Sequence, residues 1–477
     1  MRSLLFGLAL SLPMVLQAQD NAFHPSRKYH PDSVKKWIKN VMHGTAEKHP
    51  GFYRYTTKER FDFMIDSTVA TITDSLTELG FYRKLKPLYA QIGCLHTGVT
   101  LSKEYNDYLD NTKALFPFEV FIDEQKRVFV TKNYSSNPAI PIKGEIITIN
   151  GVPIANVLRT LLKSIPMDGY NESGKILLLN HRFAFWYQSM IEVTENFTIV
   201  IKKSGSTETY SANGVSKEIF PSRKSLESAY EKPLELVIKE NVAVLSIHTF
   251  AGTEIKEHGQ DFRKFIQSTF RTLKDKNITT LIVDLRYNSG GTDGNAAYLA
   301  KYFFDKPFRY WEKIEVTEAI AKEITGMKRL FYKKPKYVGN SYRWRKMWMT
   351  HEFDYYELQS PAKNNFKGKT LLLTNGLCMS SCSDLIAILS DNKRALVLGE
   401  ESGGGFQGNT SGMIPTAKIK TGLRVTIPLQ KYTNAVDVTK NVGRGTLPDY
   451  PIAISLDDWV NEKDVVMESA LKLITTN

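Results

Sequence analysis

The sequence predicts a multidomain α/β protein with a helical bundle over residues 20–110, a β-rich module over 111–225 and an α/β core over 226–477. Apolar residues recur at helical spacing up to about residue 92 and at strand spacing after it. Beyond about residue 234, apolar strands alternate with amphipathic helices, which is typical of layered α/β cores. The 477 residues, 42% of them hydrophobic, suffice for several packed domains.

The first 19 residues have the layout of a secretory signal peptide. Arg2 precedes an apolar stretch, and small or polar residues follow near Ala18. The apolar stretch is too short to span a bilayer comfortably, and no later segment reads as transmembrane. We therefore expect an exported protein, periplasmic or extracellular.

The formal net charge of +13 comes from basic residues that are spread along the chain. This distribution favours a solvated basic surface, and we do not expect a nucleic-acid partner. The cysteine count is odd, which argues against a disulfide scaffold, and the cysteines lack the partners of a zinc site. No metal or organic cofactor is implied. The three cysteines are Cys94, Cys378 and Cys382.

Three helices are expected in the N-terminal bundle. The first begins near residue 33, the second runs from about Thr56 to Gly80, and the third runs from Phe81 to about Ile92. The turn IGCLHTG, residues 92–98, follows the third helix and consists largely of small residues.

The β-rich module begins with three strands, PFEVFID, RVFVTKN and GEIITINGVPI, the last of which contains an Asn150-Gly151 turn signal. The helix IANVLRTLLKSI and the hairpin ENFTIVIKKSGSTETYSA follow. This order predicts a compact module of strands with one helix.

The α/β core opens with the hairpin LELVIKENVAVLSIHTF and the amphipathic helix DFRKFIQSTFRTLK. Three apolar strands follow, in TTLIVDLRYNSGG, KTLLLTNG and RALVLGEESGGG. Residues 315–365 interrupt the alternation with basic and aromatic side chains, and we interpret them as an insertion that could serve as a lid.

The segment LLLTNGLCMSSCSDLIAIL, residues 371–389, predicts a strand that turns sharply into a helix. Free N–H groups and the positive dipole end of a helix N-terminus suit an oxyanion. The glycines of the G-x-S-x-G nucleophile elbow are absent, so that motif does not apply. Position alone does not separate Ser380 from Ser381 as the reactive hydroxyl.

The stretch TNGLCMSSCSDLIAILSDNKRALVLGEESGGG resembles the signature of the tail-specific, or C-terminal-processing, serine peptidases of family S41. That family places its nucleophile two residues before a Ser-Glu pair. Ser383-Asp384 matches the pair, so the resemblance implies Ser381 as the catalytic nucleophile.

Further motifs of the same family occur in the expected order over about residues 234–475. LIVDLRYNSGG resembles the loop that lines the oxyanion hole, which implies backbone N–H donors at Gly290 or Gly291 and at Cys382. VLSIHTF and GRGTLPDYPI resemble the opening and closing segments of the core. The resemblance implies a ClpP/crotonase-like α/β peptidase core.

The catalytic base departs from the family's frequent Ser–Lys dyad, because GEESGGGFQG has no lysine where the dyad places one. A serine hydroxyl still needs a base. CLHTG resembles an element of the branch related to tricorn core proteases and to the retinoid-binding repeats, which implies His96 as the base. No acidic partner of the histidine stands out, and the family regions offer three candidates: Glu400, Asp449 and Asp437.

IKGEIITINGVPIANVL resembles part of the PDZ-type domain that these peptidases carry, which binds chain ends by strand addition. An unrelated β-rich spacer is the alternative. Together the motifs predict an exported serine peptidase that acts on a polypeptide through a Ser–His mechanism, with the C-terminus of the substrate as a candidate point of binding. Two other functions stay open: an inactive ligand- or peptide-binding protein on the same fold, and an esterase or other acyl hydrolase that uses the same serine.

Overall fold

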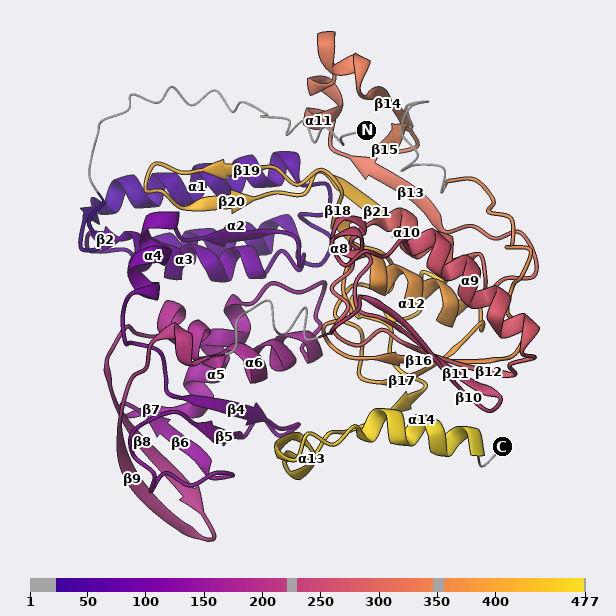
Figure 1. Ribbon diagram of the computed structural model, residues 1–477. Coiled ribbons are helices and arrows are strands. Elements are labelled where there is room, and N and C mark those ends of the chain that lie inside the picture. Colours follow the sequence, from indigo (N-terminus) through magenta and orange to yellow (C-terminus); the bar gives the residue numbers. More distant parts are fainter. Residues whose placement is uncertain (1–22, 221–229, 346–355, 476–477) are drawn as a thin grey trace.

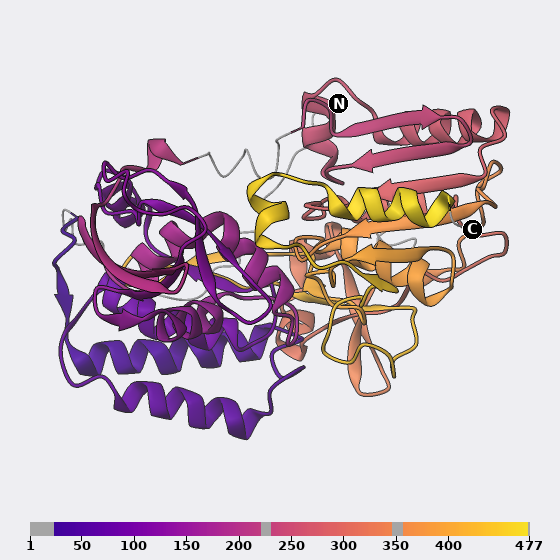
Figure 2. The same ribbon diagram turned by 90° about the horizontal axis from the view of Figure 1, so that it is seen from below.

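The computed structural model describes residues 23–220, 230–345 and 356–475 (Figure 1). The expected signal peptide therefore lies outside the described residues. Within them, no helix is both long and apolar enough to cross a membrane. Seen from below, the helical and β-rich parts lie to one side of the α/β core (Figure 2).

The N-terminal part is helical, as predicted, but its second helix is shorter than expected. Helix α2 ends at Ala70, and the chain turns before Thr77, whose side chain accepts a hydrogen bond from the Gly80 amide and so caps the next helix. The prediction of one helix up to Gly80 is therefore wrong. The elements are β1 (Lys28–Tyr29), α1 (Pro31–Lys48), α2 (Lys58–Ala70), β2 (Leu76–Thr77), α3 (Glu78–Ala90), β3 (Gly98–Thr100) and α4 (Lys103–Asp110).

The β-rich part contains an antiparallel sheet in the order β4-β5-β6-β8-β9, with β7 paired to β6. The predicted strands and helix α5 are present, but the sequence did not indicate the long helix α6. The elements are β4 (Phe118–Ile122), β5 (Val128–Asn133), β6 (Glu145–Ile149), β7 (Val152–Pro153), α5 (Ile154–Ser164), α6 (Ser173–Met190), β8 (Asn196–Lys203), β9 (Ser206–Asn213) and η1 (Lys217–Ile219).

Helix α6 covers the edge of this sheet. It packs against β4, and the Asn180 side chain accepts a hydrogen bond of 2.9 Å from the Ile122 amide. Strand β4 is an edge strand, so this amide would otherwise be open to an added peptide. The predicted strand addition is therefore not available at this position of β4.

The core contains a six-stranded sheet in the order β10-β11-β12-β16-β17-β22. Strands β10 and β11 are antiparallel, and each later neighbour is parallel. The strands are β10 (Leu234–Lys239), β11 (Val242–Ile247), β12 (Thr280–Asp284), β16 (Lys369–Thr374), β17 (Leu396–Gly399) and β22 (Tyr450–Pro451). Because β12 and β16 are adjacent and parallel, the loops that leave their carboxyl ends meet at one edge of the sheet.

Helices cover both faces of the core sheet (Figure 1). Leu371 and Leu373 pack with Val466 on the α14 side, whereas Leu372 joins the main core on the opposite side. This alternation is the two-residue period of a strand that is buried on both faces. The helices are α8 (Gly252–Glu257), α9 (Phe262–Asp275), α10 (Asp293–Ala300), α12 (Ser381–Asp391), α13 (Leu456–Val460) and α14 (Val465–Thr475).

A second sheet, not predicted from the sequence, has the order β14-β15-β13-β21-β18. It joins part of the basic insertion to residues that lie between β17 and β22 of the core sheet in the chain. Its elements are β13 (Trp311–Val316), α11 (Glu318–Glu323), η2 (Gly326–Leu330), β14 (Lys333–Val338), β15 (Ser341–Arg345), β18 (Thr410–Ser411) and β21 (Gln430–Asn434). Strands β19 (Thr416–Lys418) and β20 (Arg424–Thr426) pair instead with β3 of the helical part.

Candidate active site

The turn between β16 and α12 holds Ser380 in an unusual backbone conformation. Its φ of 52° and ψ of −132° are sparsely populated for a residue with a side chain. Ser381 is the first residue of α12, and it is fully buried. The strained turn therefore lifts Ser380 to the edge of the sheet, while the start of the helix carries Ser381 into the interior.

His96 reaches Ser380 from the helical part of the chain. Its Nε2 lies 3.1 Å from Ser380 Oγ, within hydrogen-bond distance. The Ser381 Oγ has no hydrogen-bond partner among the described residues. The structure thus corrects the predicted Ser381–His96 contact by one residue, because the residue that precedes the helix, and not its first residue, occupies the apex of the turn.

The imidazole of His96 is held neutral by its surroundings. Burial lowers the pKa of His96 to about 4, and the interaction of the ring with the Thr410 backbone, which favours the protonated form, opposes this shift only in part. Nδ1 is buried and has no partner of regular hydrogen-bond geometry in the described part of the chain. A neutral imidazole beside a serine hydroxyl can accept the hydroxyl proton.

Two loops meet at Ser380, and glycine is required at their contact. A Cβ atom on Gly290 would lie 2.7 Å from Ser380 Cβ, and Gly290 also has a φ of 103°. This loop follows β12, and the Ser380 turn follows the neighbouring strand β16. The predicted adjacency of the glycine loop and the serine turn is therefore present.

Two of the three predicted oxyanion donors are already engaged. The Gly290 amide donates to Asn288 Oδ1 at 2.9 Å, and the Cys382 amide donates to the Met379 carbonyl at 3.1 Å. Both are therefore corrected as donors to a ligand. The Cys382 amide lies one residue beyond the Ser381 amide. This is the same offset of one residue that separates the predicted nucleophile, Ser381, from Ser380.

The Gly291 amide, the third predicted donor, makes no hydrogen bond within the described residues, and neither does the Ser381 amide. Gly290 O and Thr292 N both bond to Phe250, so the intervening Gly291 N–H points away from Phe250. A Cβ on Gly290 would lie 3.1 Å from Ser381 N, which places this second free amide against the same loop. Two unengaged N–H groups thus lie beside Ser380.

None of the three predicted acidic partners bonds to His96 in the described structure. Glu400 Oε2 accepts from the Gly376 amide, Asp449 Oδ2 accepts from the Val397 amide, and Asp437 Oδ1 accepts from Thr439. Glu400 and Asp449 thus each hold a distant segment of the core, and Asp437 stabilises its own loop. The prediction that one of them orients the imidazole is corrected.

Asp168, which sequence reasoning missed, fastens the loop that carries His96. Its Oδ1 accepts from the Leu95 amide and its Oδ2 accepts from the Gly405 amide, both at 3.0 Å. Burial raises the pKa of Asp168 to about 6, and the two amide hydrogen bonds oppose the shift. One buried carboxylate therefore joins the His96 loop to the glycine-rich loop after β17. No motif surrounds Asp168 that could have marked it.

A second buried histidine fastens the other side of the same loop. His49 Nδ1 accepts from the Gly51 amide at 3.1 Å, so Nε2 carries the proton and donates to Thr97 Oγ1 at 2.8 Å. Burial is the main cause that lowers the pKa of His49 to about 3. The residues before and after His96 are thus both anchored by buried side chains.

Asp384, the acidic member of the Ser383-Asp384 pair, stabilises the base of α12. It accepts hydrogen bonds from the side-chain amides of Asn409 and Asn434, at 3.0 to 3.1 Å. Burial raises the pKa of Asp384 to about 7. The carboxyl group ties the N-terminus of α12 to the second sheet, and its hydrogen bonds in the described structure go to Asn409 and Asn434, not to His96.

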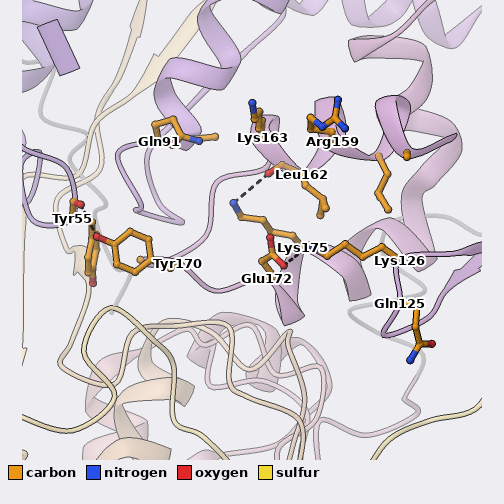
Figure 3. A pocket seen from close by; sticks show the side chains of 14 residues that line it. Tyr55, Gln91, Gln125, Lys126, Arg159, Leu162, Lys163, Tyr170, Glu172 and Lys175 are labelled. Atoms are coloured by element: carbon orange, nitrogen blue, oxygen red, sulfur yellow. Dashed lines mark hydrogen bonds and ion pairs between the residues drawn. The ribbon is translucent and has the colours of Figure 1, made fainter. Parts of the chain in front are cut away.

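A cavity of about 550 Å³ lies near this centre without containing it (Figure 3). Gly169 and Tyr170 form part of its wall, directly after Asp168. The Lys175 ammonium donates to the Leu162 carbonyl at 3.2 Å across the cavity. Its four cationic lining residues are Lys126, Arg159, Lys163 and Lys175. The loop 168–170 therefore borders both the cavity and the His96 loop.

All three cysteines are buried and free. Within the described ranges, no group of three or more His, Cys, Asp and Glu side chains is arranged to hold a metal ion.

A strained serine at a strand-to-helix turn, hydrogen bonded to a neutral imidazole, defines a serine hydrolase built on an α/β core. Residues 241–452 match the model of peptidase family S41. This matched part of the chain, which contains the core sheet and the Ser380 turn, is therefore the core of an S41 serine peptidase, as the sequence motifs indicated.

The fold resembles solved structures of CPAF along almost the whole chain. The structure of mature CPAF complexed with lactacystin has a TM-score of 0.62 and 14% identity, and the match covers 94% of this chain and 99% of that chain. The crystal structure of mature CPAF alone gives 0.59 and 14%, with 91% and 99% covered. At this identity the likeness shows the mixed α/β multidomain fold.

Proposed function

We propose that Ser380 is the nucleophile of this peptidase and that His96 is its general base. The distance of 3.1 Å between Ser380 Oγ and His96 Nε2 is the observation that carries the proposal. The strained backbone of Ser380 supports it, since such strain persists only where the surrounding structure enforces it and is frequent at active sites.

In the proposed reaction, Ser380 Oγ attacks the carbonyl carbon of the scissile peptide bond while its proton passes to His96 Nε2. The imidazolium then donates that proton to the leaving amine, and an acyl-enzyme remains. A water molecule, deprotonated by the same imidazole, hydrolyses the acyl-enzyme and restores the serine. No group other than these and water is needed for the proton balance.

The amides of Gly291 and Ser381 are the proposed oxyanion donors. They are the free N–H groups on the two sides of Ser380, and Ser381 also lies at the N-terminus of α12. A helix N-terminus favours negative charge. Removal of one such donor typically costs about 10²–10³ in kcat.

The substrate class is a polypeptide, as the peptidase family implies. Recognition of a chain end by strand addition finds no support at β4, because α6 takes up that edge. We also propose that the protein is exported, on the strength of its first 19 residues. Sequencing of the N-terminus of the protein purified from its native host tests this: a mature chain beginning near residue 20 is expected, and a retained Met1 contradicts export by this route.

Labelling with a fluorophosphonate tests the assignment of the nucleophile. Intact protein and Ser381→Ala are expected to react, whereas Ser380→Ala is not. Reaction that persists in Ser380→Ala and disappears in Ser381→Ala would restore the sequence-based assignment. No labelling of the folded wild-type protein would favour a ligand-binding protein on the same fold.

A substrate panel separates the peptidase from an acyl hydrolase. Casein, short peptides and p-nitrophenyl esters should be compared in the wild type and in Ser380→Ala. Peptide cleavage that depends on Ser380 is expected. Turnover of esters without cleavage of any peptide contradicts the peptidase activity and favours the esterase alternative.

A further inference from the structure

Residues 326–345 form a projection that the proposed mechanism does not use. They comprise η2, β14 and β15, here named the basic hairpin, and Figure 1 shows them standing out from the body of the molecule. Strand β14 is the free edge of the second sheet, and β15 attaches it to β13. The hairpin is thus anchored through β15, whereas most residues of η2 and β14 are exposed.

The basic hairpin exposes large apolar side chains. Single exposed apolar side chains are ordinary, but several gathered on one short segment are typical of contacts with proteins or membranes. Five large apolar side chains lie exposed within these twenty residues: Met327 (78%), Leu330 (62%), Phe331 (54%), Tyr337 (58%) and Val338 (41%).

The same segment carries only positive charge. It has seven basic residues and no acidic one: Lys328, Arg329, Lys333, Lys334, Lys336, Arg343 and Arg345. Lys328 lies 3.8 Å from Glu323, at the base of the hairpin. The lysines of β14 make no ion pair with any described residue. Their charge is therefore available to an anionic partner.

We propose that the basic hairpin docks the protein on an anionic lipid surface. Lysine and arginine side chains near such a surface each add to the attraction, and exposed Leu, Phe and Met side chains insert at the boundary of headgroups and acyl chains. The hairpin projects from the molecule, and its basic and apolar side chains are intermixed. Such a hairpin suits a membrane surface, because its basic side chains can meet the headgroups while its apolar side chains insert.

Other partners fit these observations less well. A nucleic acid would use the positive charge but has no use for exposed Met327 and Leu330. A second copy of the chain, related by a two-fold axis, would bring two sets of seven positive charges together. That repulsion would oppose the apolar contact.

Lipid docking leaves the catalytic pair free. The basic hairpin is at one edge of the second sheet, and β18, which contains Thr410 beside His96, is at the other. Ser380→Ala should therefore bind vesicles like the wild type. Failure of the proposed catalytic mechanism would leave the lipid proposal intact, and the reverse also holds.

Sedimentation with vesicles tests the proposal on the full chain. The wild type is expected to bind vesicles of an equal mixture of phosphatidylcholine and phosphatidylglycerol, and not vesicles of phosphatidylcholine alone. Lys333→Glu, Lys334→Glu and Lys336→Glu together should weaken binding at least about tenfold, since each basic residue near an anionic surface contributes appreciably. The double variant Leu330→Ser with Phe331→Ser should also weaken vesicle binding. This loss should be the same at low and at high salt, because it removes apolar contact and no charge.

Matched controls make the same changes elsewhere. Lys264→Glu, Lys274→Glu and Lys276→Glu reverse two exposed charges on α9 and one at its C-cap, and Val438→Ser with Val442→Ser removes two exposed apolar side chains. These variants should bind like the wild type. Equal loss in controls and hairpin variants, or no binding to the anionic vesicles, overturns the proposal.

Two further outcomes also overturn it. If the hairpin variants lose binding to duplex DNA as they lose binding to vesicles, and the apolar variant is unaffected in both, the hairpin is a general polyanion site. If sedimentation velocity shows a wild-type dimer that the hairpin variants dissociate, the surface is an interface between copies of this chain. Thermal unfolding of each variant must match the wild type for the comparison to count.

Discussion

His96 Nε2 and Ser380 Oγ lie 3.1 Å apart although 284 positions separate them in the chain. The histidine belongs to a loop of the helical part, and the serine belongs to the turn that opens α12 of the core. The pair therefore exists only when the two parts are folded against each other. Asp168 and His49 fasten the histidine loop at this junction.

Ser380→Ala is expected to reduce kcat by roughly 10⁴-fold or more, as for removal of the nucleophile in other serine peptidases. Ser381→Ala is the matched control, because it removes the neighbouring hydroxyl. That hydroxyl is buried without a partner, so its loss should leave both kcat and the thermal stability of the protein nearly unchanged. Steady-state cleavage of a peptide substrate, with thermal unfolding of each variant, decides between the two serines.

In the pH profile of kcat/KM, we expect the complete loss of activity on acidification to be centred near pH 4. His96 accepts a proton only when neutral, and burial lowers its pKa to about 4 from the ordinary 6.5. Activity is therefore present above about pH 4 and is lost as the pH falls through that value, because the imidazole becomes charged. A complete loss centred near pH 6.5 would contradict a buried, neutral base. The profile should be measured on protein whose fold is verified at each pH by circular dichroism.

The sequence predicted the core strands because their apolar runs are bounded by turns and glycines, and TLIVD and KTLLLT are buried as expected. Helix α6 was missed because its apolar residues do not keep to one face. Its Leu177, Leu179 and Phe183 are all buried, between β4 and other neighbours. Tertiary contacts on several sides of a helix erase the periodic pattern that sequence reasoning needs.

The candidate site could be predicted to within one residue. His96 and the glycine loop carry motifs, but two adjacent serines offer no local signal for which of them precedes the helix. That boundary is fixed by packing: Ser381 and Cys382 are buried, and Ser380 takes the strained turn. Asp168 lies in a loop without a motif, and its function follows only from the two amides that it meets in space.

Asp168→Asn is expected to lower kcat by about 10- to 100-fold with little change in KM, since Asp168 is a positioning residue for His96. Asparagine keeps one acceptor oxygen but presents N–H groups to the second amide, so one of the two loops is released. Burial raises the pKa of Asp168 to about 6, so its protonation should add a shallow decrease of kcat near pH 6 that disappears in the variant. Asp261→Asn, at the exposed cap of α9, is the control. If Asp168→Asn lowers the melting temperature but leaves kcat and the pH profile unchanged, Asp168 stabilises the fold and does not position His96.

Gly290→Ala is expected to abolish fluorophosphonate labelling and peptide cleavage. The added Cβ would lie 2.7 Å from Ser380 Cβ and 2.9 Å from the Met379 carbonyl oxygen, and the φ of 103° is itself unfavourable for alanine. The serine turn must shift to accommodate it, which misaligns Ser380 with His96. Gly259→Ala is a matched control, because Gly259 also has a positive φ, 72°, but faces open space. It carries the backbone strain without the steric contact and should remain active. If both variants lose activity equally, the defect is one of backbone strain and folding; if Gly290→Ala stays active, the glycine loop does not contact the serine turn in the working enzyme.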